Sequence, residues 1–91
     1  MLHIIKSQQA VKQALSYITS SDVIILIEDS VYCANQNHEL YSMVCRESVF
    51  VLDEDIDARG IRPYIGAEVR CVDYSGFVDL TAQDIVSMTW D

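Results

Sequence analysis

Runs of aliphatic residues recur along the chain and predict strands. Residues 23–27 are five apolar residues in a row without polar alternation, which is typical of a strand covered on both faces within a parallel sheet. Four further runs are rich in β-branched or aromatic residues and predict additional strands; they cover residues 2–5, 48–52, 69–72 and 85–90. The pattern predicts a mainly parallel sheet of four to five strands, with the last strand at an edge.

The segment after the first strand predicts an amphipathic helix. Ser7 can cap its start, and the polar residues 20–22 end it. The apolar positions recur at i, i+3, i+4 and i+7, so they share one helical face; they are Val11, Ala14, Leu15 and Ile18. This face would cover the sheet.

Shorter helices are predicted between the later strands. Residues 28–34 close the second strand and begin a short helix, and residues 35–39 read as a loop. Acidic residues 53–55 begin another helix, where they oppose the positive end of the helix dipole. Arg59 and Gly60 form its C-terminal end, and residues 74–80 predict a turn with a short helical segment.

Strands that alternate with short helices predict an α/β fold. The chain has 91 residues, with one proline and three glycines, so we expect a single domain over residues 1–91, folded from end to end. Its sheet would be flanked by short helices and joined by right-handed crossovers.

Charge narrows the range of partners. Six Lys and Arg against 14 Asp and Glu give a formal net charge of −8, so we expect no direct contact with nucleic acid or with an anionic membrane. The sequence has neither a secretory signal pattern nor an apolar run long enough for a membrane span. An odd number of widely spaced cysteines predicts reduced thiols, and hence a cytoplasmic protein.

The three cysteines do not form a recognisable site. A reactive thiol needs a lowered pKa and access to solvent. Cys33 lies near a helix start, but Glu28 and Asp29 just before it would raise its pKa. Cys71 lies within an apolar strand and is predicted to be a core residue, and Cys45 lies in a segment that we assign to no element. We therefore expect packing roles for all three and no catalytic residue.

Metal and cofactor sites are not predicted either. The candidate metal ligands show no paired spacing; they are His3, His38, Cys33 and Cys45. Acidic residues 53–57 lack the alternation and the glycine of a calcium loop. The three glycines are isolated and form no phosphate-binding loop.

Several segments taken together resemble the TusB/DsrH family, part of the DsrE/DsrF/DsrH-like superfamily. The chain opens with Met-Leu-His-Ile and has Trp90 near its end. Between them lie Leu-Ile-Glu-Asp-Ser-Val-Tyr at 26–32, Val-Leu-Asp-Glu-Asp-Ile-Asp-Ala-Arg-Gly at 51–60 and Val-Asp-Tyr-Ser-Gly-Phe-Val-Asp-Leu-Thr at 72–81. The resemblance covers essentially the whole chain.

The resemblance implies a fold and a function. Family members adopt a compact α/β fold with a mainly parallel sheet, and the TusB type assembles with TusC-like and TusD-like subunits into a heterohexamer. That TusBCD complex passes sulfur from a TusA-like donor to a TusE-like acceptor, for 2-thiolation of the wobble uridine of tRNA. The transferring cysteine belongs to the TusD type, so the resemblance implies a non-catalytic, structural subunit without a cofactor.

Three departures favour the TusB branch over the DsrH branch. The DsrH type carries a cysteine in its first helix, and residues 10–18 of this chain contain none. Ser30 replaces a common glycine, and Cys33 replaces a usual alanine, which favours a packing role for Cys33.

Three alternatives stay open. Cys33 could carry a persulfide, the chain could be a DsrH-like subunit in sulfur oxidation, or it could be a different small interaction domain. We expect the partner interface to include residues at the ends of the second and third strands; they are Asp29, Tyr32, Asp55 and Arg59. Arg59 could equally hold a carboxylate or cap a helix.

Overall fold

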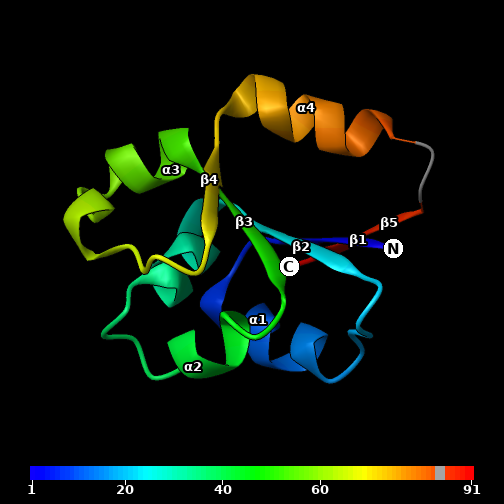
Figure 1. The fold of residues 1–91 in the computed structure, drawn as a ribbon, viewed down its shortest axis with the longest axis horizontal. Coiled ribbons are helices and arrows are strands. Elements are labelled where there is room, and N and C mark those ends of the chain that lie inside the picture. The colour runs from blue at the N-terminus through cyan, green and yellow to red at the C-terminus, as the bar shows by residue number, and fades with distance from the viewer. Residues whose placement is uncertain (84–85) are drawn as a thin grey trace.

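The computed structural model describes residues 1–83 and 86–91 and contains one five-stranded sheet in the order β4-β3-β2-β1-β5. The strands are β1 (Leu2–Ile5), β2 (Val23–Leu26), β3 (Ser48–Leu52), β4 (Arg70–Val72) and β5 (Ser87–Trp90). All four neighbouring pairs are parallel. The predicted α/β fold with a mainly parallel sheet is therefore confirmed (Figure 1).

Strand boundaries differ from the prediction by one or two residues. Ile27 leaves β2, because the chain turns there into a 3-10 helix, and Val69 precedes β4. The predicted last strand began at residue 85, which lies outside the described residues; the strand observed is Ser87–Trp90, at an edge as predicted.

Helices cover both faces of the sheet. The helices α1 (Gln8–Leu15) and α2 (Tyr41–Val44) and the 3-10 helix η1 (Glu28–Ala34) lie on one face, and α4 (Tyr74–Ala82) lies on the other (Figure 1). The helix α3 (Asp53–Ala58) and the 3-10 helix η2 (Arg62–Tyr64) connect β3 to β4. No helix within residues 1–83 and 86–91 combines the length and the apolar character that a membrane span requires.

The larger part of the core lies between the sheet and α1. It joins side chains of β1, β2 and β3 to the apolar face of α1 and to η1; its fully buried members include Ile5, Leu26, Val51, Val11, Ala14 and Val31. Burial of such side chains is the main source of folding free energy.

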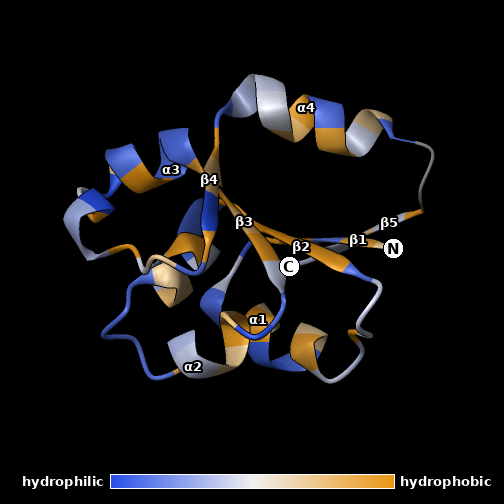
Figure 2. Ribbon diagram, viewed as in Figure 1, coloured by the Kyte–Doolittle hydropathy of each residue, from blue (hydrophilic) through white to orange (hydrophobic). Residues whose placement is uncertain are grey.

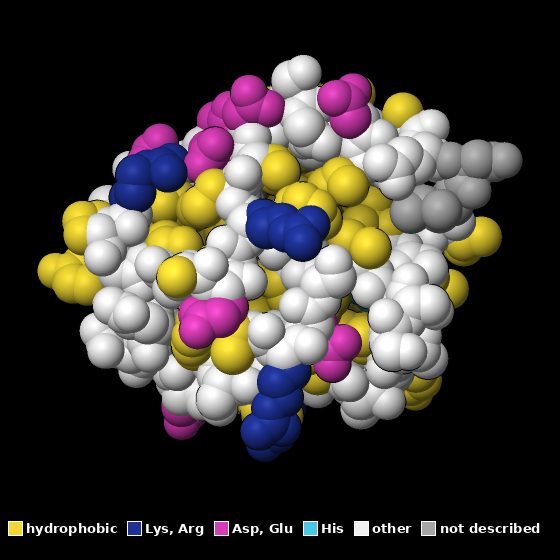
Figure 3. Space-filling model, in the orientation of Figure 1, with side chains coloured by type: hydrophobic (Ala, Val, Ile, Leu, Met, Phe, Trp, Pro, Cys, Tyr) yellow, Lys and Arg dark blue, Asp and Glu magenta, His cyan; other side chains and the backbone are white. Residues whose placement is uncertain are grey.

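The face under α4 is less completely covered. Phe77 and Leu80 of α4 pack on Leu2, Ile25 and Leu52, but no residue of α4 is itself buried. Figure 2 shows hydrophobic segments along the strands and on α4 above them, and hydrophobic atoms remain visible beneath α4 in Figure 3. One short helix is too small to cover this face.

The first helix begins as predicted and ends early. Ser7 caps it by accepting a hydrogen bond from the Ala10 N–H at 3.1 Å. The prediction that Ile18 belongs to the helix is wrong, because the Ser16 hydroxyl donates to the Gln13 carbonyl at 2.7 Å and the last turn tightens there. Ile18 still packs against the core from outside the helix.

Candidate functional site

The residues predicted as a partner interface lie together at the carboxyl edge of the sheet. Parallel strands end at the same edge, so η1 after β2 and α3 after β3 start side by side. Arg59 donates from Nε and Nη2 to Asp29 Oδ1, at 3.1 and 2.8 Å. Its guanidinium lies 3.7 Å from Asp55 Oδ1 and 5.9 Å from the centre of the Tyr32 ring. These four residues are called the Arg59 cluster below.

Within the cluster Arg59 has two structural tasks. It holds the Asp29 carboxylate, and its Nη1 donates to the Asp55 carbonyl of α3 at 3.2 Å. Both alternatives considered for Arg59, carboxylate binding and helix capping, are therefore present. The hydrogen bond to Asp29 raises the pKa of Arg59, so its charge persists at every working pH. Asp29 itself is 66% exposed and remains accessible to a partner.

The backbone beside the cluster is conformationally constrained. Glu28 has a φ of +53°, in the left-handed region that non-glycine residues seldom adopt. Its N–H donates to Asp55 Oδ2 at 2.6 Å. The Asp55 side chain therefore fixes the turn out of β2 and contacts Arg59 at the same time.

A second ion-pair group lies on α3 and η2. Arg62 donates from Nε to Asp57 at 2.7 Å and from Nη2 to Asp53 at 3.0 Å. The hydrogen bond from Arg62 lowers the pKa of Asp57. Asp53 and Asp57 therefore share one arginine, and sequence analysis did not predict this role of Arg62.

The cysteines differ in their surroundings. Cys33 is fully buried, as predicted for a packing residue, and burial raises its pKa to about 11, with Glu39 adding to the effect. Cys45 is partly exposed. The prediction that Cys71 is a core residue is wrong, because β4 is an edge strand and leaves the side chain exposed.

His3 is buried and fully hydrogen-bonded. Trp90 donates from its indole Nε1 to His3 Nδ1 at 3.0 Å, so Nε2 carries the proton and donates to Asp22 at 3.0 Å. The ring has no nitrogen free for a metal. Residues 1–83 and 86–91 contain no group of three or more His, Cys, Asp or Glu side chains that could hold a metal ion.

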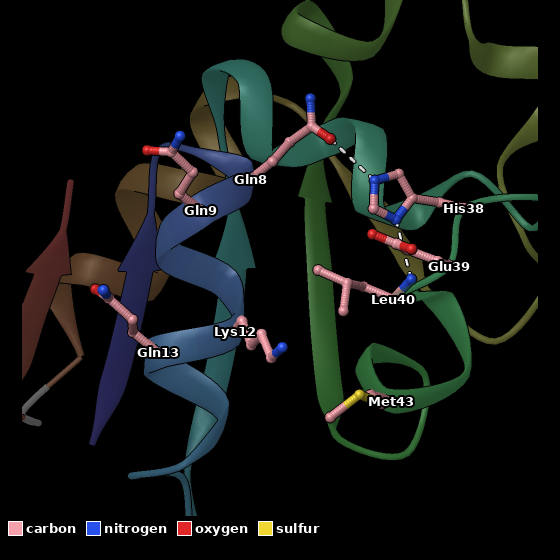
Figure 4. A pocket seen from close by; sticks show the side chains of 8 residues that line it. All are labelled: Gln8, Gln9, Lys12, Gln13, His38, Glu39, Leu40 and Met43. Atoms are coloured by element: carbon pink, nitrogen blue, oxygen red, sulfur yellow. Dashed lines mark hydrogen bonds between the residues drawn. The ribbon is translucent and has the colours of Figure 1, made fainter.

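A groove of about 800 Å³ lies between α1 and residues 38–43 (Figure 4). His38 Nδ1 accepts the Leu40 N–H at 3.0 Å, so Nε2 donates to Gln8 Oε1 at 2.9 Å and ties the two walls together. The other lining residues are Gln9, Lys12, Gln13, Glu39 and Met43. Most of its lining residues are polar, but apolar atoms form the larger part of its surface, and Lys12 and Glu39 balance in formal charge. Sequence analysis did not predict it, because its walls come from segments with no shared motif.

Comparisons with known proteins point to one family. A family model described as DsrH like protein matches residues 6–85. Protein TusB of Yersinia enterocolitica is 32% identical over 78 residues, which cover 84% of this chain and 82% of that protein. Protein TusB of Yersinia pestis is 33% identical with the same coverage.

A solved structure supports the fold. The solution NMR structure of protein Tm0979 from Thermotoga maritima aligns with a TM-score of 0.65 at 22% identity and covers 92% of this chain and 94% of its own. At this identity the likeness concerns the fold alone.

Proposed function

This chain belongs to the DsrH-like family, and from that membership we propose that it is a non-catalytic subunit of a TusBCD-type sulfur-relay complex. In this proposal the complex serves the 2-thiolation of the wobble uridine of tRNA in the cytoplasm. TusC-like and TusD-like proteins are the direct partners in a heterohexamer, and the TusA-like donor and the TusE-like acceptor are contacted through it. The observation that carries the proposal is the family match over residues 6–85, together with relatives named Protein TusB.

The burial and the raised pKa of Cys33 support the proposal that this subunit is non-catalytic. A sulfur carrier must present a thiolate to the incoming persulfide, and the buried Cys33 thiol has a pKa of about 11. At neutral pH the thiol is protonated and closed to solvent. This favours packing over the alternative in which Cys33 carries a persulfide.

We propose the Arg59 cluster as part of the interface with the partner subunits. Asp29 is exposed, whereas Asp55 and Arg59 are 24% and 21% exposed and held by one another. A rigid, partly exposed set of charged groups suits specific recognition, because little side-chain entropy is lost on binding.

Co-purification tests the assembly. A tagged chain co-expressed with the TusC-like and TusD-like proteins of the same organism should retain both through size-exclusion chromatography. Asp29→Ala should weaken this retention, whereas Asp79→Ala, which removes an exposed carboxylate of α4, should not. A wild-type chain that elutes alone would contradict the proposal.

The thiols are tested separately. A complex in which Cys33 is alanine and Cys45 and Cys71 are serine should assemble and still support tRNA thiolation, measured as 2-thiouridine in digested tRNA. Loss of 2-thiouridine in a stably assembled Cys33→Ala complex would contradict the non-catalytic role. Mass spectrometry after incubation with a desulfurase and a TusA-like donor should find Cys33 without added sulfur.

A further inference from the structure

Strand β5 lies at the end of the sheet, and no strand within residues 1–83 and 86–91 pairs with its outer side. The Leu2 N–H donates to the Val86 carbonyl and the Lys6 N–H to the Trp90 carbonyl, both at 2.9 Å. In a parallel ladder alternate residues direct their backbone groups to the same side, so Ser87 and Thr89 direct theirs away from β1. Both residues are exposed. The outer side of β5 is therefore open for pairing.

The apolar side chains of this edge share one sheet face. Val86 is 69% exposed and Met88 is 45% exposed, and Trp90 follows at the same two-residue spacing. Tyr17, which is 70% exposed, lies against Trp90 with ring centres 5.5 Å apart. Natural edge strands are usually protected by charged residues, proline or a bulge. The sequence Ser-Met-Thr-Trp of β5 has no charged residue and no proline.

The charge distribution favours contact at this edge. The chain carries a net charge of −8, yet residues 13–21 and 86–90 contain no charged residue. Acidic residues instead follow the strands at the carboxyl edge of the sheet, where Asp91, directly after β5, lies 3.6 Å from Lys6 Nζ and is partly neutralised by it. Two copies of an acidic chain approach most easily through a neutral strip, because like charges then stay far apart.

The uncharged segment 86–90 can pair with the same segment of a second copy in an antiparallel arrangement. A two-fold axis at Met88 places this residue opposite Met88 of a second copy. Ser87 of each copy then faces Thr89 of the other, and these two pairs exchange backbone hydrogen bonds through the groups that point outward. Val86 of each copy faces Trp90 of the other, so the apolar side chains meet on one face.

We infer that this chain forms a homodimer by antiparallel pairing of β5 with β5 of a second copy. The two sheets join into one, and the edge strand loses its free backbone groups. The contact is isologous, as a closed two-fold dimer requires. This inference uses residues 17 and 86–90 and is independent of the proposed relay.

Sedimentation equilibrium of the isolated full-length chain tests the dimer. The wild type should have twice the chain mass of 10.3 kDa. Met88→Lys would set two ammonium groups against each other at the axis, and Thr89→Pro would remove an outward N–H that an edge strand can lose without unfolding. Each variant should weaken dimerisation by about tenfold or more.

A matched control and a folding check accompany these variants. Tyr64, which is 49% exposed on η2, precedes the opposite edge strand β4, so Tyr64→Lys should leave the dimer intact. Circular dichroism and thermal melts of Met88→Lys and Thr89→Pro should show a folded chain.

Cross-linking tests the register directly. In a chain with Cys45→Ser and Cys71→Ser, Met88→Cys should give a covalent dimer on mild oxidation, because opposite Cα atoms at such a position are about 4.5 Å apart. Thr89→Cys in the same background should cross-link much less, because its opposite residue is Ser87.

Two outcomes would overturn the inference. They are a monomeric wild-type chain and a dimer that survives both Met88→Lys and Thr89→Pro. If the chain is monomeric and its Met88→Lys variant also loses the TusC-like and TusD-like partners, β5 pairs with a different subunit. Wild-type co-purification reports separately on the proposed relay, so the two failures are distinguishable.

Discussion

At the scale of single residues, Ser30 shows how a polar side chain is accommodated in the core. Its hydroxyl is fully buried and lies 2.5 Å from the Ile5 carbonyl and 2.7 Å from the Ile27 carbonyl. It therefore joins the ends of β1 and β2. Both carbonyls also accept backbone N–H groups, so neither is left without a partner when the hydroxyl is removed.

We expect Ser30→Ala to lower the free energy of unfolding by about 1 kcal/mol, the usual net value of a neutral hydrogen bond. Ser30→Gly should cost ~0.5–1 kcal/mol more, because glycine gains freedom in the unfolded chain. Urea denaturation followed by circular dichroism gives both values. Ser16→Ala, which removes a similar but exposed hydroxyl contact, is the control and should cost less. An unchanged Ser30→Ala midpoint would refute the assigned role.

The three thiols should react at different rates. Cys71 is exposed and Cys45 partly exposed, whereas Cys33 is buried with its pKa raised to about 11. We expect iodoacetamide at mildly alkaline pH to modify Cys71 and Cys45 in the folded protein and Cys33 only on unfolding, since alkylation needs an accessible thiolate. Peptide mass spectrometry with and without urea measures the order. Rapid native modification of Cys33 would contradict its burial.

The same residues mark a limit of sequence analysis. The composition rule that free cysteines are buried was right for Cys33 and wrong for Cys71. Burial of a strand residue depends on whether its strand lies in the middle or at the edge of the sheet. No local pattern around residues 69–72 contains that information, because strand order is set by the crossovers.

At the scale of elements, α2 holds the segment between η2 and β4 through one close contact. A Cβ on Gly66 would lie 1.8 Å from the Tyr41 hydroxyl oxygen, so the ring occupies the space that only glycine leaves free. The Tyr41 hydroxyl also donates to Glu68. The Gly66 N–H in turn donates to the Ala34 carbonyl at 3.0 Å and fixes the segment to the end of η1.

We expect Gly66→Ala to destabilise the protein by about 1–3 kcal/mol, the range for forcing extra atoms into a packed site. Gly66→Ala should lower the free energy of unfolding by less in a Tyr41→Ala background, where the clash is gone. A double-mutant cycle therefore isolates the contribution of the contact between residues 41 and 66. Thermal unfolding of the four proteins provides the cycle. Equal costs in the two backgrounds would show that the Tyr41 contact is not the cause.

Elements were predictable in proportion to their length and regularity. The apolar runs identified all five strands, although residue 85 of the last run lies outside the described residues. The helix α2 was missed because four residues are too few to show a helical period. The end of α1 was misplaced because Ser16 closes the last turn, an effect that the apolar spacing up to Ile18 conceals.

At the scale of the whole molecule, parallel topology determines what a sequence can reveal about the site. The Arg59 cluster was predictable, because successive parallel strands end at one edge and their following residues must meet there. The ion pairs of Arg62 and the groove beside α1 were not, because they depend on side-chain directions and on the packing of residues 38–43.

Acid stability depends on contacts that join distant parts of the chain. Asp22 accepts hydrogen bonds from His3 Nε2 at 3.0 Å and from the Thr19 N–H at 3.1 Å, and these hold its pKa well below the ordinary value of 3.8. His3 in turn accepts a hydrogen bond from the Trp90 indole. The hydrogen bonds of Asp22, His3 and Trp90 therefore connect the start of β2 through β1 to β5. The Tyr41 hydroxyl likewise lowers the pKa of Glu68 below its ordinary 4.5.

Some carboxyl groups have a lower pKa in the folded chain than in the unfolded chain. Such a group stabilises the fold when the pH is above its pKa in the unfolded chain. That contribution disappears as the pH falls, because the unfolded chain then binds protons that the folded chain excludes. We therefore expect urea midpoints that change little between about pH 7 and 5 and fall steeply below about pH 4.5. Asp22→Asn should lower the midpoint at neutral pH and flatten the fall in acid, whereas Asp79→Asn, at an exposed position on α4, should do neither. If Asp22→Asn keeps the full acid dependence of the wild type, the acid sensitivity comes from protonation of other carboxylates, and the Asp22 contact with His3 is not its cause.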